Sequence, residues 1–234
     1  MVTRLMKGFF NRNPPMPRYP QTWDVAPVLK FLRDMPSWEN SSQKLLSLKL
    51  VLLLDLVTAG RVSSLTTIDI KQLSVSENVL RFVPIRLQKQ TRPSFPLKTM
   101  EIQSFEDVRM CPVHGVSVYL KKTESLRGSE TQLLISHVKP FKKVVSSAVS
   151  RWLLDILKQA GVNTDIFKAH STRGAATSAS VRLGASMRYV LTTAGWSSAS
   201  TFSSFYHRPS ANSVVAKTLL GGASKSPIDW TGGR

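Results

Sequence analysis

The chain has 234 residues, which suits one domain of good size with tails, and its hydrophobic content of 42% is that of a folded protein. Lys and Arg together number 32 against 14 for Asp and Glu, so the formal net charge is +18. No apolar run reaches the length of a membrane span, because Asp55 interrupts the densest one, residues 50–57. The single cysteine, Cys111, excludes an intrachain disulfide. These features predict an intracellular protein with a nucleic-acid partner and no membrane.

The distribution of charge favours the same partner. No Asp or Glu occurs between Asp165 and Asp229. A segment without carboxylates suits close approach to phosphates, which nearby negative charges would repel. The basic residues of this interval are Lys168, Arg173, Arg182, Arg188, Arg208, Lys217 and Lys225.

The first predicted elements are an arm and a helix. Residues 1–21 include a proline-rich stretch without apolar periodicity and are predicted to be a flexible arm or linker. The folded domain is predicted over residues 22–210. Thr22 or Asp24 can cap its first helix, which is expected over residues 25–35.

The second predicted helix is the most apolar part of the chain. Ser41 or Ser42 can cap it, and it is expected to run to about Ala59. Because it is apolar on nearly every side, it is predicted to lie in the core. Gly60 is expected to end it in the left-handed conformation, with Arg61 directly after.

A small antiparallel sheet is predicted next, from β-branched and alternating residues. Its three strands are expected over residues 64–70, 79–85 and 95–102, with turns at 76–78 and 88–93. The second turn carries Lys89 and Arg92.

Helices are predicted again in the rest of the chain. They are expected from Pro112 to about Lys121, from Ser146 or Ser147 to Gly161, over residues 168–183, over 187–194 and from Ser200 through Tyr206. Residues 211–234 are predicted to be a tail with a helix over 214–220. The predicted fold class is therefore mainly α with a small three-stranded antiparallel β-sheet, an α+β fold.

The strongest local pattern is His170-Ser171-Thr172-Arg173. On a helix, residues three apart share a face, so the imidazole of His170 and the guanidinium of Arg173 would point to one spot. Both groups can donate to a phosphate oxygen. This pair alone is a weak motif, but Arg61, Trp196 and Tyr206 accompany it in the order Arg, His-x-x-Arg, Trp, Tyr.

In this set the chain resembles the tyrosine recombinase (phage integrase) family, whose order is Arg, Lys on a β-turn, His-x-x-Arg, His or Trp, then Tyr. The resemblance extends from about Trp23 to Pro209. Four short sequence motifs look closest to those of the recombinases of DIRS-like retrotransposons and cryptons. They are Cys111-Pro112-Val113, Ala169-His170-Ser171-Thr172-Arg173-Gly174, Ala194-Gly195-Trp196-Ser197-Ser198 and Phe205-Tyr206-His207-Arg208-Pro209.

The resemblance implies a site-specific recombinase that integrates a mobile element by cutting and rejoining double-stranded DNA. Tyr206 would be the nucleophile that forms a 3′-phosphotyrosine, and Lys89 the general acid. Arg61, His170, Arg173 and Trp196 would stabilise the charge on the phosphate. Neither metal, cofactor nor ATP would be needed. The resemblance also implies a tetramer on DNA, a nuclear location and the tyrosine recombinase catalytic-domain fold.

Other interpretations of these residues stay open. Arg86, Arg92 and Lys98 compete with Lys89 as the general acid, and Trp196 and Tyr206 can be core aromatics. Cys111 and His114 have the spacing of half a zinc site. In function, the alternatives are an inactive DNA-binding protein derived from such a recombinase and a type IB topoisomerase-like enzyme.

Two departures from the family pattern bear on the site. The family commonly has an acidic residue three positions after the first arginine, where this chain has Ser64. The step from Trp196 to Tyr206 is also one residue longer than the usual nine, and Phe205 occupies the ninth position. The acidic support of the site is therefore expected to be different or lost.

Overall fold

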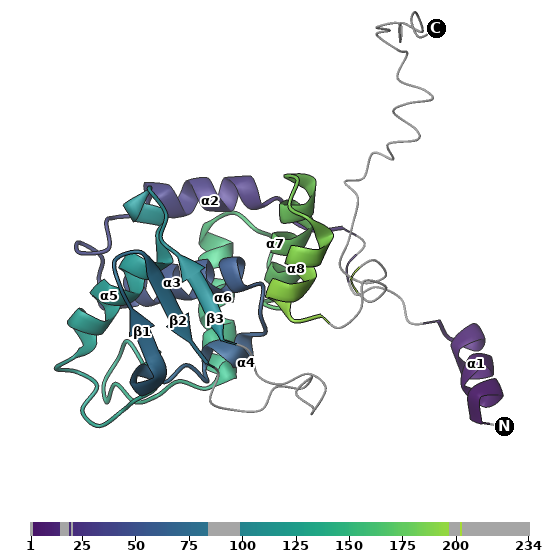
Figure 1. Ribbon diagram of the computed structural model, residues 1–234, viewed down its shortest axis with the longest axis horizontal. Helices are drawn as coiled ribbons and strands as arrows, with labels where there is room; N and C mark the ends of the chain where they lie inside the picture. The colour runs from purple at the N-terminus through teal and green to yellow at the C-terminus, as the bar shows by residue number, and fades with distance from the viewer. Residues whose placement is uncertain (1, 15–18, 20, 84–98, 197–201, 203–234) are drawn as a thin grey trace, which may run out of the picture.

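The structure, a computed structural model, describes residues 2–14, 19, 21–83, 99–196 and 202. Within these residues the chain forms α-helices around one three-stranded antiparallel sheet of order β1-β2-β3, as Figure 1 shows. The predicted fold class, mainly α with a small antiparallel sheet, is confirmed. None of the described helices is long and apolar enough to cross a membrane.

The elements follow the chain in this order. The helices are α1 (Val2–Arg12), α2 (Val25–Asp34), α3 (Gln43–Thr58), α4 (Val62–Leu65), α5 (Pro112–Thr123), α6 (Ser146–Gln159), α7 (Ser171–Arg182) and α8 (Met187–Ala194). The strands are β1 (Leu73–Val75), β2 (Val79–Phe82) and β3 (Met100–Gln103), and two 3₁₀ turns cover Ile70–Gln72 and Val108–Met110.

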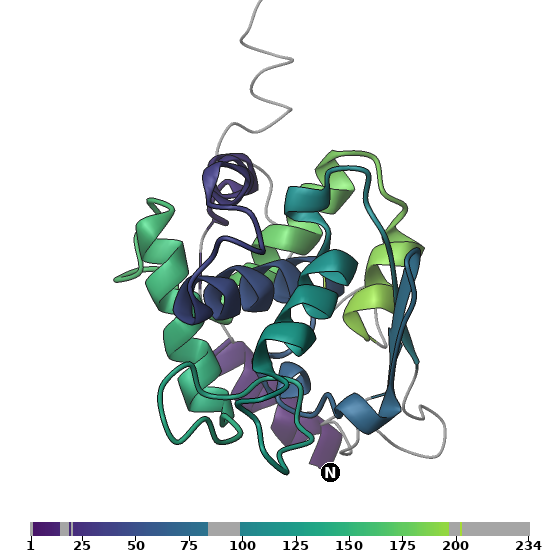
Figure 2. The same cartoon turned by 90° about the vertical axis from the view of Figure 1, so that its left-hand side faces the viewer.

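Helix α3 is the centre of the fold. It packs against α5, α6 and α7, and Figure 2 shows it between α5 and α6. Its fully buried leucines point to all sides of the helix, as the apolar sequence predicted: Leu46, Leu48, Leu50, Leu52 and Leu54. Burying each such side chain contributes about 1.5–3 kcal/mol. The same helix also buries two titratable residues, Lys49 and Asp55.

The sheet covers one side of this core. Leu80 and Phe82 of β2 are buried and alternate with Arg81, which is exposed. Leu80 pairs with Ile102 of β3, which is also buried. The predicted turn at residues 76–78 joins β1 to β2, where the Ser76 amide donates to the Val79 carbonyl at 2.9 Å. The other predicted turn lies outside the described residues.

The first predicted strand, residues 64–70, is wrong. Helix α4 and a turn occupy most of this range, and β1 begins only at Leu73. The hydroxyls of Thr66 and Thr67 donate to the carbonyls of Ser63 and Ser64, each at 2.8 Å. Such local bonds offer the backbone an alternative to a strand ladder, and here they outweigh the β-propensity of the threonines.

One further expectation needs correction. Ala59, not Gly60, adopts the left-handed conformation at the end of α3, with φ of 45°. Residues 1–21, predicted to be a flexible arm or linker, contain helix α1 over Val2–Arg12. The apolar residues Leu5, Met6 and Phe9 of α1 have the spacing of one face of a helix.

Candidate active site

The first turn of α7 carries the His-x-x-Arg pair. His170 is the N-cap residue, with helical φ and ψ of −63° and −20°, and its side chain is exposed. Arg173 is 2% exposed and donates from Nη2 to the carbonyl of Ala194, at 2.8 Å. Its Cζ lies 4.1 Å from the centre of the Trp196 ring. A guanidinium over an aromatic face is attracted by the ring electrons and held in a fixed plane.

The end of α8 explains why Trp196 lies over Arg173. Gly195 is left-handed, with φ of 67°, and the Trp196 amide donates to the carbonyl of Leu191 at 2.9 Å. This turn reverses the chain at the helix end, which glycine permits without steric cost. The indole of Trp196 then packs at 5.1 Å against the ring of Phe202. The predicted helix over 187–194 and its closure at Gly195 are confirmed.

The chain segment of Arg61 lies in the same region, after the end of α3. Ala59 belongs to a small core cluster that includes Ala176 of α7 and Trp196. Packing in this cluster holds the left-handed conformation of Ala59, which costs free energy for a residue other than glycine. Arg61 follows two residues later as the half-buried N-cap of α4. The structure therefore brings the chain segments of Arg61, Arg173 and Trp196 together.

Two residues that sequence reasoning did not assign support the first turn of α7. The indole nitrogen of Trp23 donates to the buried hydroxyl of Ser171 at 2.9 Å, across 148 positions of sequence. On the α3 side, Asp55 is 2% exposed and faces Thr172 and Arg173. Burial raises the pKa of Asp55 from 3.8 to about 7, although a hydrogen bond with Thr172 and the positive charge of Arg173 both act to lower it.

The remaining predicted site residues lie outside the described residues. These are Tyr206, Lys89 and the three competitors of Lys89, namely Arg86, Arg92 and Lys98. Their roles stay predictions. The expected helix from Ser200 and the tail helix over 214–220 also fall there, apart from Phe202.

Comparison with known proteins gives the family of this fold and site. The sequence pattern of the Phage integrase family matches residues 29–212, which is most of the chain and includes every predicted catalytic residue. The chain belongs to the phage integrase family. Its members are the tyrosine recombinases, which break and rejoin DNA without metal or ATP. None of the curated proteins matches the chain in sequence.

Solved structures show the same fold. XerA recombinase superposes with a TM-score of 0.61 at 18% identity, over 91% of this chain and 68% of XerA. XerH recombinase bound to its difH substrate gives 0.59 at 12% identity, over 80% of this chain and 49% of XerH. A lambda integrase fragment, a dimer bound to a core site, gives 0.53 at 16% identity, over 89% and 63%. The chain thus spans between half and about two thirds of these recombinases.

Cys111 and His114, which have the spacing of half a zinc site, make other contacts in the structure. His114 Nε2 lies 2.8 Å from a carboxylate oxygen of Glu39, and the sulfur of Cys111 accepts the amide of Phe105 at 3.4 Å. Among the described residues, no group of three His, Cys, Asp or Glu side chains is placed to hold a metal.

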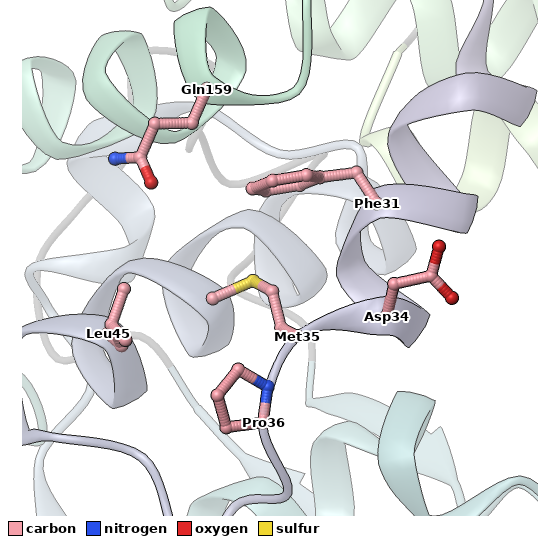
Figure 3. A pocket seen from close by; sticks show the side chains of 6 residues that line it. All are labelled: Phe31, Asp34, Met35, Pro36, Leu45 and Gln159. Carbon is pink, nitrogen blue, oxygen red and sulfur yellow. The ribbon is translucent and has the colours of Figure 1, made fainter.

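A surface hollow of about 260 Å³ lies away from the family site. Figure 3 shows its lining, which comes from the end of α2, the start of α3 and the end of α6: Phe31, Asp34, Met35, Pro36, Leu45 and Gln159. Leu45 is in the first turn of α3, whereas Arg61 follows its last. At a rise of about 1.5 Å per residue, the two ends of this helix are more than about 20 Å apart. The hollow therefore contributes nothing to the site.

Proposed function

We propose that this chain is the catalytic part of a site-specific DNA recombinase that cuts and rejoins double-stranded DNA through Tyr206. The observation that carries the proposal is the contact of Arg173 with Trp196 at the end of α8, with the segment of Arg61 beside it. A buried guanidinium of fixed orientation is suited to bind a phosphate and to stabilise the extra charge of the transition state. Recombinases of the same fold have been captured on DNA, as XerH and lambda integrase were.

The proposed chemistry is a transfer of the phosphoryl group in two steps. The Tyr206 oxygen gives up its hydroxyl proton to water and attacks the scissile phosphorus while the bond to the 5′-oxygen breaks, and Lys89 gives a proton to that leaving oxygen. Arg61, His170, Arg173 and Trp196 stabilise the charge that gathers on the nonbridging oxygens. A 5′-hydroxyl then attacks the 3′-phosphotyrosine and releases Tyr206. The energy of the broken bond is conserved in the intermediate.

The biological setting is a further part of the proposal. The sequence motifs around Cys111, His170 and Tyr206 favour a role in the integration of a mobile element of the DIRS-like or crypton kind. Such a role would place the protein in the nucleus. We propose a tetramer on DNA, with the helix over 214–220 docked on a neighbouring protomer. Deletion of residues 211–234 should then reduce the assembly on trapped DNA to smaller species, measured by sedimentation.

Covalent trapping tests the chemistry. A pool of nicked duplexes with a randomised central sequence is incubated with the full chain, and protein–DNA adducts are resolved under denaturing conditions. We expect an adduct on the 3′ side of the break with the wild type and none with Tyr206→Phe. Tyr189→Phe is the matched control, because Tyr189 is 76% exposed on α8 and should leave the adduct unchanged.

Each result separates the candidate functions. An adduct that persists in Tyr206→Phe would remove Tyr206 as the nucleophile. Binding of the pool without an adduct at any position would favour the DNA-binding protein that has lost cleavage. Rapid relaxation of supercoiled DNA by the monomer would favour the topoisomerase.

A further inference from the structure

The last turn of α3 buries a carboxyl group beside the arginine of the site. Asp55 is 2% exposed, and its Oδ1 has no hydrogen-bond partner among the described residues. Its neighbours on α7 are the side chain of Thr172 and the charge of Arg173. A buried acid without full hydrogen bonding is costly, and it is more costly when ionised. The position therefore calls for a reason beyond packing.

Arg173 gives that reason, because it is as deeply buried as Asp55. A buried guanidinium needs a counter-charge, and the family position that usually offers an acid holds Ser64 here. Asp55, in the last turn of α3, instead lies close enough to Arg173 for the charge of Arg173 to act on it. This acid comes from α3 rather than from the turn after Arg61.

Other charged groups on the helices around Asp55 do not alter this pairing. They stand on α3 itself, at the start of α4, and on α5, α6 and α7. Within the described part of the chain, Arg173 is the one charged group that contributes to the pKa of Asp55. The others are Lys44, Lys49, Arg61, His114, Lys121, Lys122, Arg151, Asp155, Lys158, His170 and Arg182.

A phosphate bound at Arg173 would compete with Asp55 for the same positive charge. The phosphodiester is permanently anionic, so the carboxylate is the group that can yield, by taking up a proton from water. Once neutral, Asp55 can donate to the hydroxyl of Thr172, which already donates to the carbonyl of Ala169 at 3.0 Å. The buried carboxyl then keeps Thr172 as its hydrogen-bonding neighbour when it loses its charge.

We propose that Asp55 is the counter-charge of Arg173 in the free protein and takes up a proton when a DNA phosphate replaces it. Asp55 is thus a positioning residue that couples phosphate binding to protonation. The inference rests on the proposed function in that Arg173 must meet a phosphate, but it does not require cleavage. With a pKa of about 7 before DNA binds, the carboxyl is poised to change state near neutral pH.

The first test follows protonation directly and needs no cleavage. In the full chain carrying Tyr206→Phe, the carbon-13 shift of the Asp55 carboxyl is titrated with and without excess duplex DNA; loss of the signal in Asp55→Asn assigns it. We expect a midpoint near pH 7 without DNA and a midpoint at least one pH unit higher with DNA. An equal midpoint in both samples would overturn the proposal.

The second test uses single-turnover adduct formation across pH. An ionised Asp55 must take up a proton before the phosphate binds. Each pH unit above the midpoint of Asp55 should therefore lower the rate of adduct formation by the wild type about tenfold. The rate of Asp55→Asn relative to wild type should therefore rise about tenfold between pH 6 and pH 8. A ratio that stays constant, or falls, contradicts the proposal.

Matched variants separate this coupling from a loss of packing. Lys49→Met removes the other buried charge of α3, and its rate relative to wild type should not change between pH 6 and pH 8. Asp55→Ser, neutral at every pH, should follow Asp55→Asn and replaces it if the amide does not fold. If no protein forms adducts, the proposed function fails while the carbon-13 titration still decides the coupling.

Discussion

The two halves of α3 each bury one charged residue, and they accommodate it in different ways. In the first half, the Lys49 ammonium lies 4.8 Å from the centre of the Trp38 ring and 3.5 Å from the Pro36 carbonyl. These are local partners that serve no site. In the second half, Asp55 has Thr172 and Arg173 as neighbours and one oxygen without a described partner. The charge that lies only in the core has local partners, whereas the charge behind the site depends on a residue with another task.

Replacement of Arg173 should give the largest effect. Arg173→Lys removes the planar fork that lies over Trp196, and we expect adduct formation to fall about 100- to 1000-fold. Arg127→Lys is the control, because Arg127 is also buried but donates to the carbonyls of Gln132 and Leu133, in a loop that holds no site residue. That variant should be less stable yet cleave within a fewfold of wild type per folded molecule. Equal losses in both variants would mean that burial, not phosphate binding, explains Arg173.

The pH dependence of stability separates Asp55 from Lys49. Burial raises the pKa of Asp55 from 3.8 in the unfolded chain to about 7, so folding binds a proton in that interval. Its contribution to stability is therefore full below pH 4 and declines as the pH rises to about 7. Between pH 5 and pH 8 this loss amounts to about 3 kcal/mol. In urea unfolding, the free energy of unfolding of Asp55→Asn should rise relative to that of wild type by about this amount between pH 5 and pH 8.

Lys49 should show the opposite sign. Burial, with the nearby charge of Arg109, lowers the pKa of Lys49 from 10.5, so the unfolded chain binds more protons just below that value. The destabilisation from the buried ammonium is then full at low pH and declines as the pH rises toward 10.5. Lys49→Met should lose its advantage over wild type in that alkaline range. The comparison of the two halves breaks down if both variants show the same slope.

A smaller effect is expected where α7 is held from its other side. Trp23→Phe keeps an aromatic ring but removes the donor to Ser171, whose hydroxyl is buried. An unsatisfied buried hydroxyl costs about 1–3 kcal/mol, and we expect a loss of stability in that range in urea. Trp152→Phe is the control, since Trp152 is half-buried and packs only partly on the core. A loss no larger than that of the control would show that the hydrogen bond does not hold the turn.

Local chemistry explains which elements the sequence predicted well. Asp24, Ser42 and Ser186 each cap their helices through the side chain, and Gly195 ends α8 in the left-handed conformation. These signals are read within three or four residues, so the boundaries of α2, α3 and α8 follow from the sequence. The strand expected over residues 64–70 failed because hydroxyl bonds of Thr66 and Thr67 depend on a turn that propensity alone does not reveal.

The site could be predicted as a set of residues but not as a structure. The order of Arg61, His170, Arg173 and Trp196 carries the family, and the contact of Arg173 with Trp196 follows from α7 and α8. The supports of the site lack such a signal. Asp55 was visible only as a charge that interrupts an apolar run, and nothing local indicates that it faces α7. Such contacts depend on how the helices pack against one another, which the periodicity of apolar residues does not indicate.

The smallest effect is expected at a charge pair in water, which completes the comparison with the two buried charges of α3. Arg81 of β2 and Glu101 of β3 form an exposed cross-strand pair, with a distance of 2.7 Å between Nε and Oε2. Water and salt screen such a pair, so Arg81→Ala should change the free energy of unfolding by less than about 1 kcal/mol. A double-mutant cycle with Glu101→Ala measures the coupling, which should vanish at about 1 M salt. A coupling as large as the effects at Asp55 would show that the environment of a charge on this protein matters less than its partner.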